Sequence, residues 1–597
     1  MQPQATTGLV RRLREGTPRL SAMARANDAV AELFQEYADL IAITGGEAFR
    51  ARVYEKAARA VAGYPADVST LDRKGLEGIP NVGGSTAAKI AEYLGTGRIE
   101  AVEKLRGRIP AGVRELTRIP GLGPKRAVQL YEQLGVGSLA DLVTAIEDGR
   151  VAGLRGFGAR AVTNLQRGIE LLAASGGRVL ISEAAEVAAE IVGLLAAVPG
   201  CMRVEPAGSL RRMRETIGDV DILAASDDPE PLMETFAGLP LVADVIVRGP
   251  TKTSIRTAAG LQVDLRVVPP AAWGAALQYF TGSQAHNIRV RERAVRAGLT
   301  LSEYGLFRAD DGELIASGTE EEVYRRLDLP WIPPVLREDR GEVRAALRGE
   351  LPELIRVEDI LGDLHTHTDL TDGVSSLEEM LAAARERGYR YYAVTDHAKD
   401  LPMQRMTDAK MLAQRDRLRE LAGDGGMVLL HGTELNIGPD GGVDWDAGFL
   451  AGFDLCVASV HSHFGQDQAT MTRRLIRACE NPYVTVIGHP TTRLINRRPA
   501  IDADWDAVFQ AAAQTGTAME INAFPDRLDL GDELIMRAKA RGVRFAIDTD
   551  AHSTVHLGLL RYGVGTAGRG WLTARDVINA WPLEELRAFI DAKRRAG

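Results

Sequence analysis

Three aspartates in the first half of the chain have the type and spacing to hold divalent metal ions. Asp219 and Asp221 are two residues apart in DVDILAA, a run that predicts a strand. Side chains alternate along a strand, so both carboxylates project from the same face. Asp264 interrupts the apolar run VDLRVV, where an acid is costly to bury without a cationic partner. Three such carboxylates suit two Mg²⁺ or Mn²⁺ ions and the in-line transfer of a phosphoryl group.

The residues just before this pair carry groups that bind phosphate. Gly208 and Ser209, in AGSLRRMRETIGDVDIL, can present backbone and hydroxyl donors, and Arg212 can neutralise a departing pyrophosphate. Two aspartates in a DxD pattern, standing alone, are more often a solvent-facing acidic pair. The neighbouring phosphate-binding groups favour a catalytic site instead.

A second set of candidate ligands lies in the other half of the chain. Nine of the ten histidines lie between positions 365 and 556, where short apolar runs such as YYAVTDH and LCVASVHSH alternate with helical segments. This alternation predicts a barrel or parallel sheet, whose strand ends gather residues at one rim. A lone buried histidine is usually only hydrogen-bonded, but six histidines and three carboxylates at successive strand ends exceed the needs of one ion. Zn²⁺, Mn²⁺ or Fe²⁺ suits such ligands. The nine residues are His365, His367, Asp372, His397, Glu434, His461, His489, Asp550 and His552.

Composition and charge limit the classes of protein. The 597 residues allow about four domains. No apolar stretch is long enough for a membrane span, no secretory signal is evident, and three dispersed cysteines indicate a reducing, cytoplasmic compartment. The net charge of −9 hides an asymmetry, because residues 1–300 hold 37 Lys and Arg against 33 Asp and Glu. Only that half has the net positive charge that favours binding of a polyanion such as a nucleic acid.

Three glycine-containing turns in this half each precede a helix. They lie in GIPNVGGSTAAKI, RIPGLGPKRAVQL and GLRGFGARAVTNL. Such turns aim backbone N–H groups at a phosphate, and the helix N-terminus favours negative charge. One such turn alone is usually an ordinary loop, but the three resemble helix-hairpin-helix motifs, which bind the DNA backbone without reading sequence. The residues expected to contact DNA here are Gly83, Gly121, Gly123, Lys125 and Arg126.

The GSxRR and GDxD motifs together resemble the nucleotidyltransferase palm of family X DNA polymerases. YFTGSQAHN is similar to the family's nucleotide-binding segment, which assigns nucleotide contacts to Tyr279, Phe280, Gly282, Ser283 and Asn287. By the same resemblance Lys252 faces template or primer, and Gln262 stands where the family has an arginine. Lys89 falls at the Schiff-base lysine of the family's lyase domain, although a surface helix lysine is the alternative, and Arg50 and Ser85 replace supporting lysines.

The second half resembles the polymerase and histidinol phosphatase (PHP) domain, a distorted seven-stranded β/α barrel holding up to three metals. The family pattern implies three ligand sets: His365, His367, Glu434 and Asp550; Glu434, His461 and His489; and Asp372, His397 and His552. His431, His463 and His556 fall outside it. Such a site cleaves phosphate esters with activated water. The resemblance implies a 3′–5′ exonuclease, with 3′-phosphatase or abasic-site endonuclease activity as further possibilities.

The patterns and resemblances together predict a multidomain fold. Expected are an extension (1–26), a lyase-like helical domain (27–105), a fingers-like helical domain (106–178), an α/β palm (179–270), a thumb (271–335), a linker (336–357) and the PHP barrel (358–597). The leading hypothesis is a monomeric enzyme that fills short gaps in primer-template DNA with dNTPs and trims 3′ ends. A DNA-binding scaffold carrying the barrel as sole enzyme, and a barrel that is only structural, are the alternatives; the complete ligand sets argue against both.

Overall fold

The computed structural model describes residues 26–44, 48–107, 113, 116–117, 119, 122–158, 161–163, 165–166, 168–169, 177–401, 406–422 and 426–596. The chain divides into two compact units, one built on Gly177–Leu354 and the other on Arg25–Gly176 together with Ile355–Gly597. Each is described by itself. None of the helices in these described stretches combines the length and apolar character needed to span a lipid bilayer.

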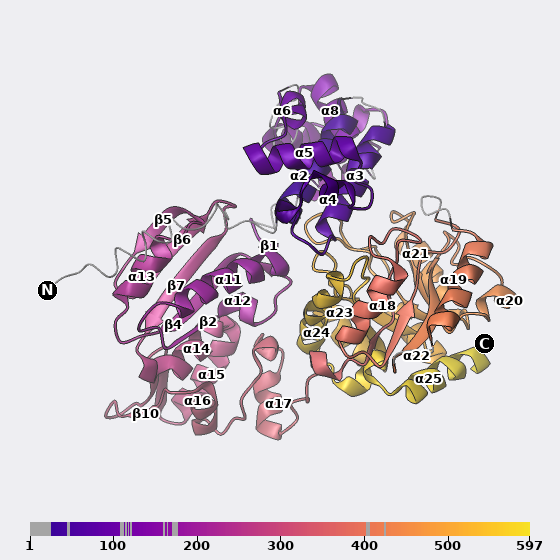
Figure 1. Ribbon diagram of the computed structural model, residues 1–597. Coiled ribbons are helices and arrows are strands. Elements are labelled where there is room, and N and C mark those ends of the chain that lie inside the picture. Colours follow the sequence, from indigo (N-terminus) through magenta and orange to yellow (C-terminus); the bar gives the residue numbers. More distant parts are fainter. Residues whose placement is uncertain are drawn as a thin grey trace. The chain divides into compact units, whose positions relative to one another are not determined.

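The amino-terminal part of the second unit contains helices and, among its described residues, no strand, as its periodic Ala- and Leu-rich segments predict (Figure 1). Its core includes Phe34, Tyr37 and Tyr54, which pack ring against ring between the first two helices. The helices are α2 (Ala26–Ile43), α3 (Ala48–Ala62), α4 (Arg73–Glu77), α5 (Gly84–Thr96), α6 (Glu100–Arg106), α8 (Pro124–Leu134) and α9 (Leu139–Glu147).

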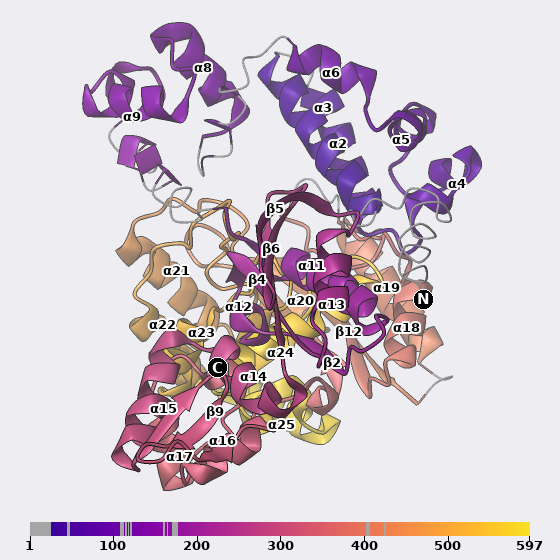
Figure 2. The same cartoon turned by 90° about the vertical axis from the view of Figure 1, so that its left-hand side faces the viewer.

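The first unit is built on a five-stranded sheet in the order β2-β4-β7-β6-β5. Strands β4 and β7 are parallel, and the other neighbouring pairs are antiparallel. Figure 2 shows helices α11 (Ile181–Ala196) and α13 (Glu230–Ala237) beside these strands. The strands are β2 (Arg203–Pro206), β4 (Asp219–Ala225), β5 (Val242–Arg248), β6 (Lys252–Thr257) and β7 (Gln262–Val268). A two-stranded pair, β1 (Val179–Leu180) with β3 (Thr216–Ile217), lies outside this sheet.

One face of β4 explains why acids can begin an otherwise apolar strand. Asp219 and Asp221 share this face with Leu223 and Ala225, and the last two pack under helix α14 (Trp273–Thr281). The apolar end of the face is therefore buried, whereas Asp219 at its other end is exposed and Asp221 is half-buried. Burial of the strand's second half fixes which face the aspartates occupy.

The rest of the first unit follows the sheet along the chain. It contains α12 (Gly208–Arg211), α15 (Gln284–Arg296), α16 (Glu320–Arg326), α17 (Glu342–Arg348) and an antiparallel sheet of β8 (Leu299–Ser302), β9 (Gly305–Arg308) and β10 (Leu314–Ala316). Segment 336–357, predicted as a linker, includes α17, and the fully buried Glu342 contacts the fully buried His286 at 2.6 Å. Arg337 is also buried and pairs with Glu320. These buried charges anchor the segment to the thumb.

The carboxyl-terminal part contains seven parallel strands in chain order, β11 to β17. A bridge between Thr366 and Ala551 joins the first strand's end to the last strand's end, so the sheet curls into a barrel. The strands are β11 (Gly362–Asp363), β12 (Tyr391–Val394), β13 (Val428–Asn436), β14 (Leu455–Ser459), β15 (Val484–Ile487), β16 (Ala518–Asn522) and β17 (Phe545–Asp548).

Helices follow the strands and cover the barrel (Figure 1). Their apolar faces pack on the strands in one large core, which includes Met380, Phe509 and Leu475. The helices are α18 (Leu377–Glu386), α19 (Asp408–Leu421), α20 (Ala447–Leu450), α21 (Gln468–Glu480), α22 (Trp505–Thr515), α23 (Asp532–Lys539), α24 (Leu560–Arg569) and α25 (Leu583–Ala596). The structure thus has the predicted fold class.

Candidate active sites

The palm aspartates meet through the register of two parallel strands. Asp221 of β4 lies opposite Asp264 of β7, and Asp219 lies opposite Gln262. Burial, with the charges of Asp219 and Asp264, raises the pKa of Asp221 to about 7, against the opposing charge of Lys252. Bringing these acids together is costly without cations, so the arrangement fits a divalent-metal site.

Lys252 and Gln262 both contact Asp264. The Lys252 ammonium lies 2.7 Å from Asp264 Oδ2, and the Gln262 amide donates to Oδ1 at 3.0 Å. Burial alone would raise the pKa of Asp264, but these hydrogen bonds hold it below its ordinary value. The structure therefore places Lys252 against Asp264, one of the predicted metal ligands, and its predicted contact with DNA stays a prediction.

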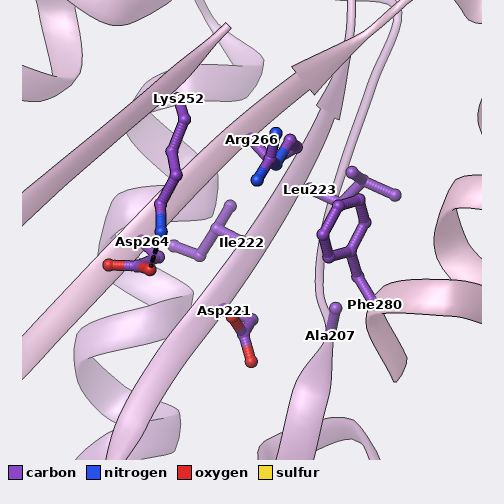
Figure 3. A pocket seen from close by; sticks show the side chains of 8 residues that line it. All are labelled: Ala207, Asp221, Ile222, Leu223, Lys252, Asp264, Arg266 and Phe280. Atoms are coloured by element: carbon purple, nitrogen blue, oxygen red, sulfur yellow. Dashed lines mark ion pairs between the residues drawn. The ribbon is translucent and has the colours of Figure 1, made fainter. Parts of the chain in front are cut away.

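Figure 3 shows the pocket beside these residues. Phe280, from the predicted nucleotide-binding segment, lines it together with Asp221 and Asp264. Arg266 also lines the pocket, and its guanidinium lies 4.9 Å from the centre of the Phe280 ring. The sequence analysis did not single out Arg266, although its position two residues after Asp264 places both on one face of β7.

The other predicted nucleotide contacts are held by local hydrogen bonds. Asn287 is buried, accepts from Gln278 at 2.7 Å and donates to the backbone oxygen of Tyr279 at 2.7 Å. Ser283 caps helix α15. Arg212 donates to Glu338 at 3.1 Å and to the Thr281 carbonyl. These contacts give the segment one fixed conformation beside the aspartates.

The nine predicted barrel ligands converge at the carboxyl ends of the strands. Three groups place one ligand atom from each member within 4.8 Å of the others: His367, Asp372, His397 and His552; His365, His367 and Asp550; and His397, Glu434 and His461. His489 adjoins them, with Nε2 3.1 Å from Glu434 Oε1. The three palm aspartates, all among the described residues, do not bring one ligand atom each within 4.8 Å of the others.

Glu434 lies at the centre of this cage. One of its oxygens lies 3.0 Å from His461 Nε2 and 3.5 Å from His365 Nε2, and the other lies 2.8 Å from His397 Nδ1. The second predicted ligand set, Glu434 with His461 and His489, is therefore close together. Asp372 Oδ1 joins the third set, at 3.4 Å from His397 and 3.3 Å from His552.

The donor atoms of the cage fit bound cations. Buried nitrogens or oxygens of His365, His367, Asp372, His397 and His489 have no hydrogen-bond partner. Such atoms are costly to bury, and metal ions would satisfy them. The charges of the surrounding histidines hold the pKa of Glu434 well below its ordinary value, although burial opposes this. The carboxylate is therefore ionised and ready to bind a cation.

Residues behind the ligands orient them, and the sequence analysis missed these residues. Glu520 lies 2.6 Å from His365 Nδ1, and Asn436 accepts from His461 Nδ1 at 2.7 Å. Because each Nδ1 is occupied, each Nε2 is directed to the cage. Both residues interrupt apolar strand runs, where a polar side chain needs a partner. This interruption is the feature of the sequence that could have identified them.

The three histidines outside the family pattern belong to none of the three groups. Burial lowers the pKa of His431 and of His556 to about 3. His431 packs on Phe453, and His556 accepts the backbone N–H of His552. His463 is exposed.

The helix-hairpin-helix turns are partly described. Gly83 and Gly123 are the N-caps of α5 and α8, whereas Gly121 lies outside the described residues. Lys125 is exposed, and Arg126 lies over the Phe157 ring. Asn81, which replaces the usual glycine, has a φ of +62°, a conformation that asparagine tolerates.

The predicted lyase lysine lies on helix α5. Its ammonium contacts Ser85 Oγ at 3.2 Å and lies 5.7 Å from the centre of the Tyr54 ring. Neither contact distinguishes a Schiff-base lysine from a surface helix lysine, so the role of Lys89 stays a prediction.

Family models match four segments of the chain. Residues 25–99 match a helix-hairpin-helix domain, 113–170 a SAM-like helix-hairpin-helix tandem, 276–338 the DNA polymerase beta thumb and 363–524 the PHP domain. DNA polymerase lambda of Rattus norvegicus is 29% identical over 49% of this chain and 53% of its own. A probable phosphatase of Thermoanaerobacter sp. (strain X514) is 27% identical over 39% of this chain and 95% of its own.

One relative spans nearly the whole protein. The DNA polymerase/3′-5′ exonuclease PolX of Bacillus subtilis (strain 168) is 35% identical over 94% of this chain and 98% of its own length. This similarity runs through nearly all of both chains. This chain belongs to the family X DNA polymerases that carry a PHP domain.

Proposed function

We propose that this chain is a DNA-directed DNA polymerase that fills short gaps in DNA repair and that its barrel is a metal-dependent 3′–5′ exonuclease. The observation that supports the proposal is the presence of two groups of candidate ligands, one with Asp221 opposite Asp264 across β4 and β7 and one at the barrel rim. The name of the full-length relative supports both activities, and that of DNA polymerase lambda supports the polymerase activity. Gapped or primer-template DNA and dNTPs are the substrates, and the enzyme acts as a cytoplasmic monomer.

In the palm, Asp219, Asp221 and Asp264 would hold Mg²⁺ or Mn²⁺. Bound metal would activate the primer 3′-hydroxyl and neutralise the triphosphate. Arg212, fixed by Glu338, would bind the pyrophosphate as it leaves. Phe280 would pack against the incoming nucleotide, because its ring lines the pocket beside Asp221.

In the barrel, the nine ligands would hold up to three Mn²⁺, Zn²⁺ or Fe²⁺ ions. Bound metal would supply an activated water for cleavage of a phosphodiester. Glu520 and Asn436 hold their histidines in the tautomer that directs Nε2 to the cage. A 3′-phosphatase is the second candidate activity, favoured by the match to a probable phosphatase over 95% of that protein's length. Abasic-site endonuclease activity has no comparable observation in its favour.

Two double variants of the full chain test the proposal. With gapped DNA and Mn²⁺, Asp219→Ala with Asp221→Ala should abolish primer extension and retain 3′-end degradation. His365→Ala with His367→Ala should retain extension and abolish degradation. Undiminished synthesis by the first variant would remove the polymerase assignment, and metal-dependent degradation by the purified second variant would remove the nuclease assignment.

A further inference from the structure

Two arginines outside the predicted ligand set lie at the same end of the barrel as the metal cage. Arg498 is in the loop after β15, which also carries the ligand His489, and Arg527 is in the loop after β16. The Nε atom of Arg527 lies 3.7 Å from Oδ2 of the ligand Asp550. Its Nη1 atom is buried and has no hydrogen-bond partner, while 22% of the side chain is exposed. Arg527 thus has an unused donor beside the cage and an opening to solvent.

Arg498 is held in place by contacts with two loops. Its Nε donates to the backbone oxygen of Thr492 at 2.7 Å, and its guanidinium lies 4.3 Å from the centre of the Phe464 ring. Phe464 is in the loop after β14, which also carries the ligand His461. Stacking and the backbone hydrogen bond orient the guanidinium before any ligand binds, which lowers the cost of binding.

The loops after β15 and β16 concentrate positive charge. Residues 488–501 and 523–531 contain four arginines, Arg493, Arg497, Arg498 and Arg527, against the two aspartates Asp526 and Asp529. Asp526 pairs with Arg497, and Asp529 accepts the backbone N–H of Thr491. Burial and the charge of Arg527 lower the pKa of Arg498 to about 10. Asp526 and Asp529 offset part of this repulsion, and an anion bound by both guanidinium groups would offset more of it.

We propose that Arg498 and Arg527 form a phosphate-binding subsite that holds the non-bridging oxygens of the phosphate cleaved at the barrel. This inference rests on the proposed nuclease function and names how that site recognises its substrate. A guanidinium presents its N–H groups in a planar fork that matches two phosphate oxygens, and the adjoining cage would hold the metal at the same phosphate. The phosphodiester of a DNA 3′ end is the expected ligand. A free phosphate monoester presents the same charged non-bridging oxygens.

The decisive experiment uses Mn²⁺-loaded full-length protein and the variants Arg498→Ala, Arg527→Lys and Arg541→Ala. Arg541 is the matched control, because it pairs with Asp506 at 3.0 Å between α23 and β17, before the amino end of β17. We expect Arg498→Ala to raise the KM for single-stranded DNA and the Kd for inorganic phosphate by about tenfold or more. Arg541→Ala should change neither, and bound Mn²⁺ measured by mass spectrometry should be the same in all proteins.

Arg527 adjoins the predicted metal ligand Asp550, so its substitution can also change metal binding. A changed KM or Kd for Arg527→Lys therefore counts only if the variant binds as much Mn²⁺ as the wild type. Arg498 contacts none of the predicted metal ligands, so the result for Arg498→Ala decides the proposal. A wild-type KM and phosphate Kd for Arg498→Ala would overturn it. Loss of phosphate affinity with an unchanged KM for DNA would assign the subsite to phosphate monoesters instead and overturn the DNA assignment. An inactive wild-type protein with normal Mn²⁺ content would instead refute the nuclease function.

A substrate with a neutral linkage supplies a second readout. A methylphosphonate at the last internucleotide position removes one charged non-bridging oxygen. We expect it to raise the wild-type KM, and to change the KM of Arg498→Ala by a smaller factor because the interaction is already lost. Equal factors in the two proteins would contradict direct contact between this arginine and the phosphate.

Discussion

Gly208 lies so close to the Asp221 carboxylate that position 208 has no room for a side chain. A Cβ atom added to Gly208 would lie 2.0 Å from Asp221 Oδ2, and the φ of Gly208 is +58°. Glycine is needed here both for the backbone conformation and for the close approach of the Asp221 carboxylate, a predicted metal ligand.

Gly208→Ala should therefore displace Asp221 and lower the rate of nucleotide incorporation by about 100-fold. Exonuclease activity should not change, because the barrel has its own ligands. Gly260→Ala is the control, since Gly260 has a φ of +87° but no atom within 4 Å of an added Cβ. Single-turnover extension assays check both variants. Equal losses in both would attribute the effect to backbone strain alone.

Glu320 links the palm to the thumb through buried ion pairs. It contacts Arg211 at 2.9 Å and Arg337 at 2.6 Å. Burial opposes ionisation, but Arg337 and Arg211 together lower the pKa of Glu320 from 4.5 to about 2. Because the folded pKa is depressed, this stabilisation is present above pH 4.5 and is lost as the pH falls toward 2.

Glu320→Gln should therefore lower the unfolding free energy at pH 7 by on the order of 1–3 kcal/mol, and by less as the pH falls below 4.5. Denaturant unfolding followed by tryptophan fluorescence measures the difference, since Trp331 Nε1 donates to Glu320 at 3.0 Å. A difference that stays constant from pH 7 to pH 3 would contradict the assigned pKa shift.

Glu520 should contribute to metal affinity without binding metal itself. Its oxygen lies 2.6 Å from His365 Nδ1 and holds the ring with Nε2 toward the cage. Glu520→Gln should weaken Mn²⁺ binding by about 10- to 100-fold, because the neutral amide orients the imidazole less strongly. Calorimetric titration measures this, with the exposed Glu584→Gln as control. Equal Mn²⁺ affinity in the two variants would remove the orienting role.

Lys125 should contribute a phosphate contact that does not depend on DNA sequence. It is exposed in the first turn of α8, two residues after the N-cap Gly123. Lys125→Ala should weaken binding to all duplexes alike and reduce the slope of log affinity against log salt by about 0.9. Fluorescence anisotropy at several salt concentrations checks this, with Lys410→Ala on the barrel as control. The same slope in the wild type and Lys125→Ala would exclude the contact.

Local patterns in the sequence determined much of this protein. Alternation along β4 placed Asp219 and Asp221 on one face, and apolar runs ending in histidine or carboxylate predicted the barrel and the residues at its rim. These features follow from the period of the strand and from the chemistry of each side chain. The domain boundaries, and the roles of individual site residues, stay predictions that the variants above test.

Contacts between distant residues were decided only by the tertiary structure. Strand register set Asp221 against Asp264, and folding brought Glu520 to His365 and Arg527 to Asp550. Helix α17 lies within the segment predicted as a linker, and there folding pairs Glu342 with His286. Burial of an isolated Glu342 or Glu520 would be too costly, and the partner that makes it favourable lies far away in the sequence. No local pattern carries that information.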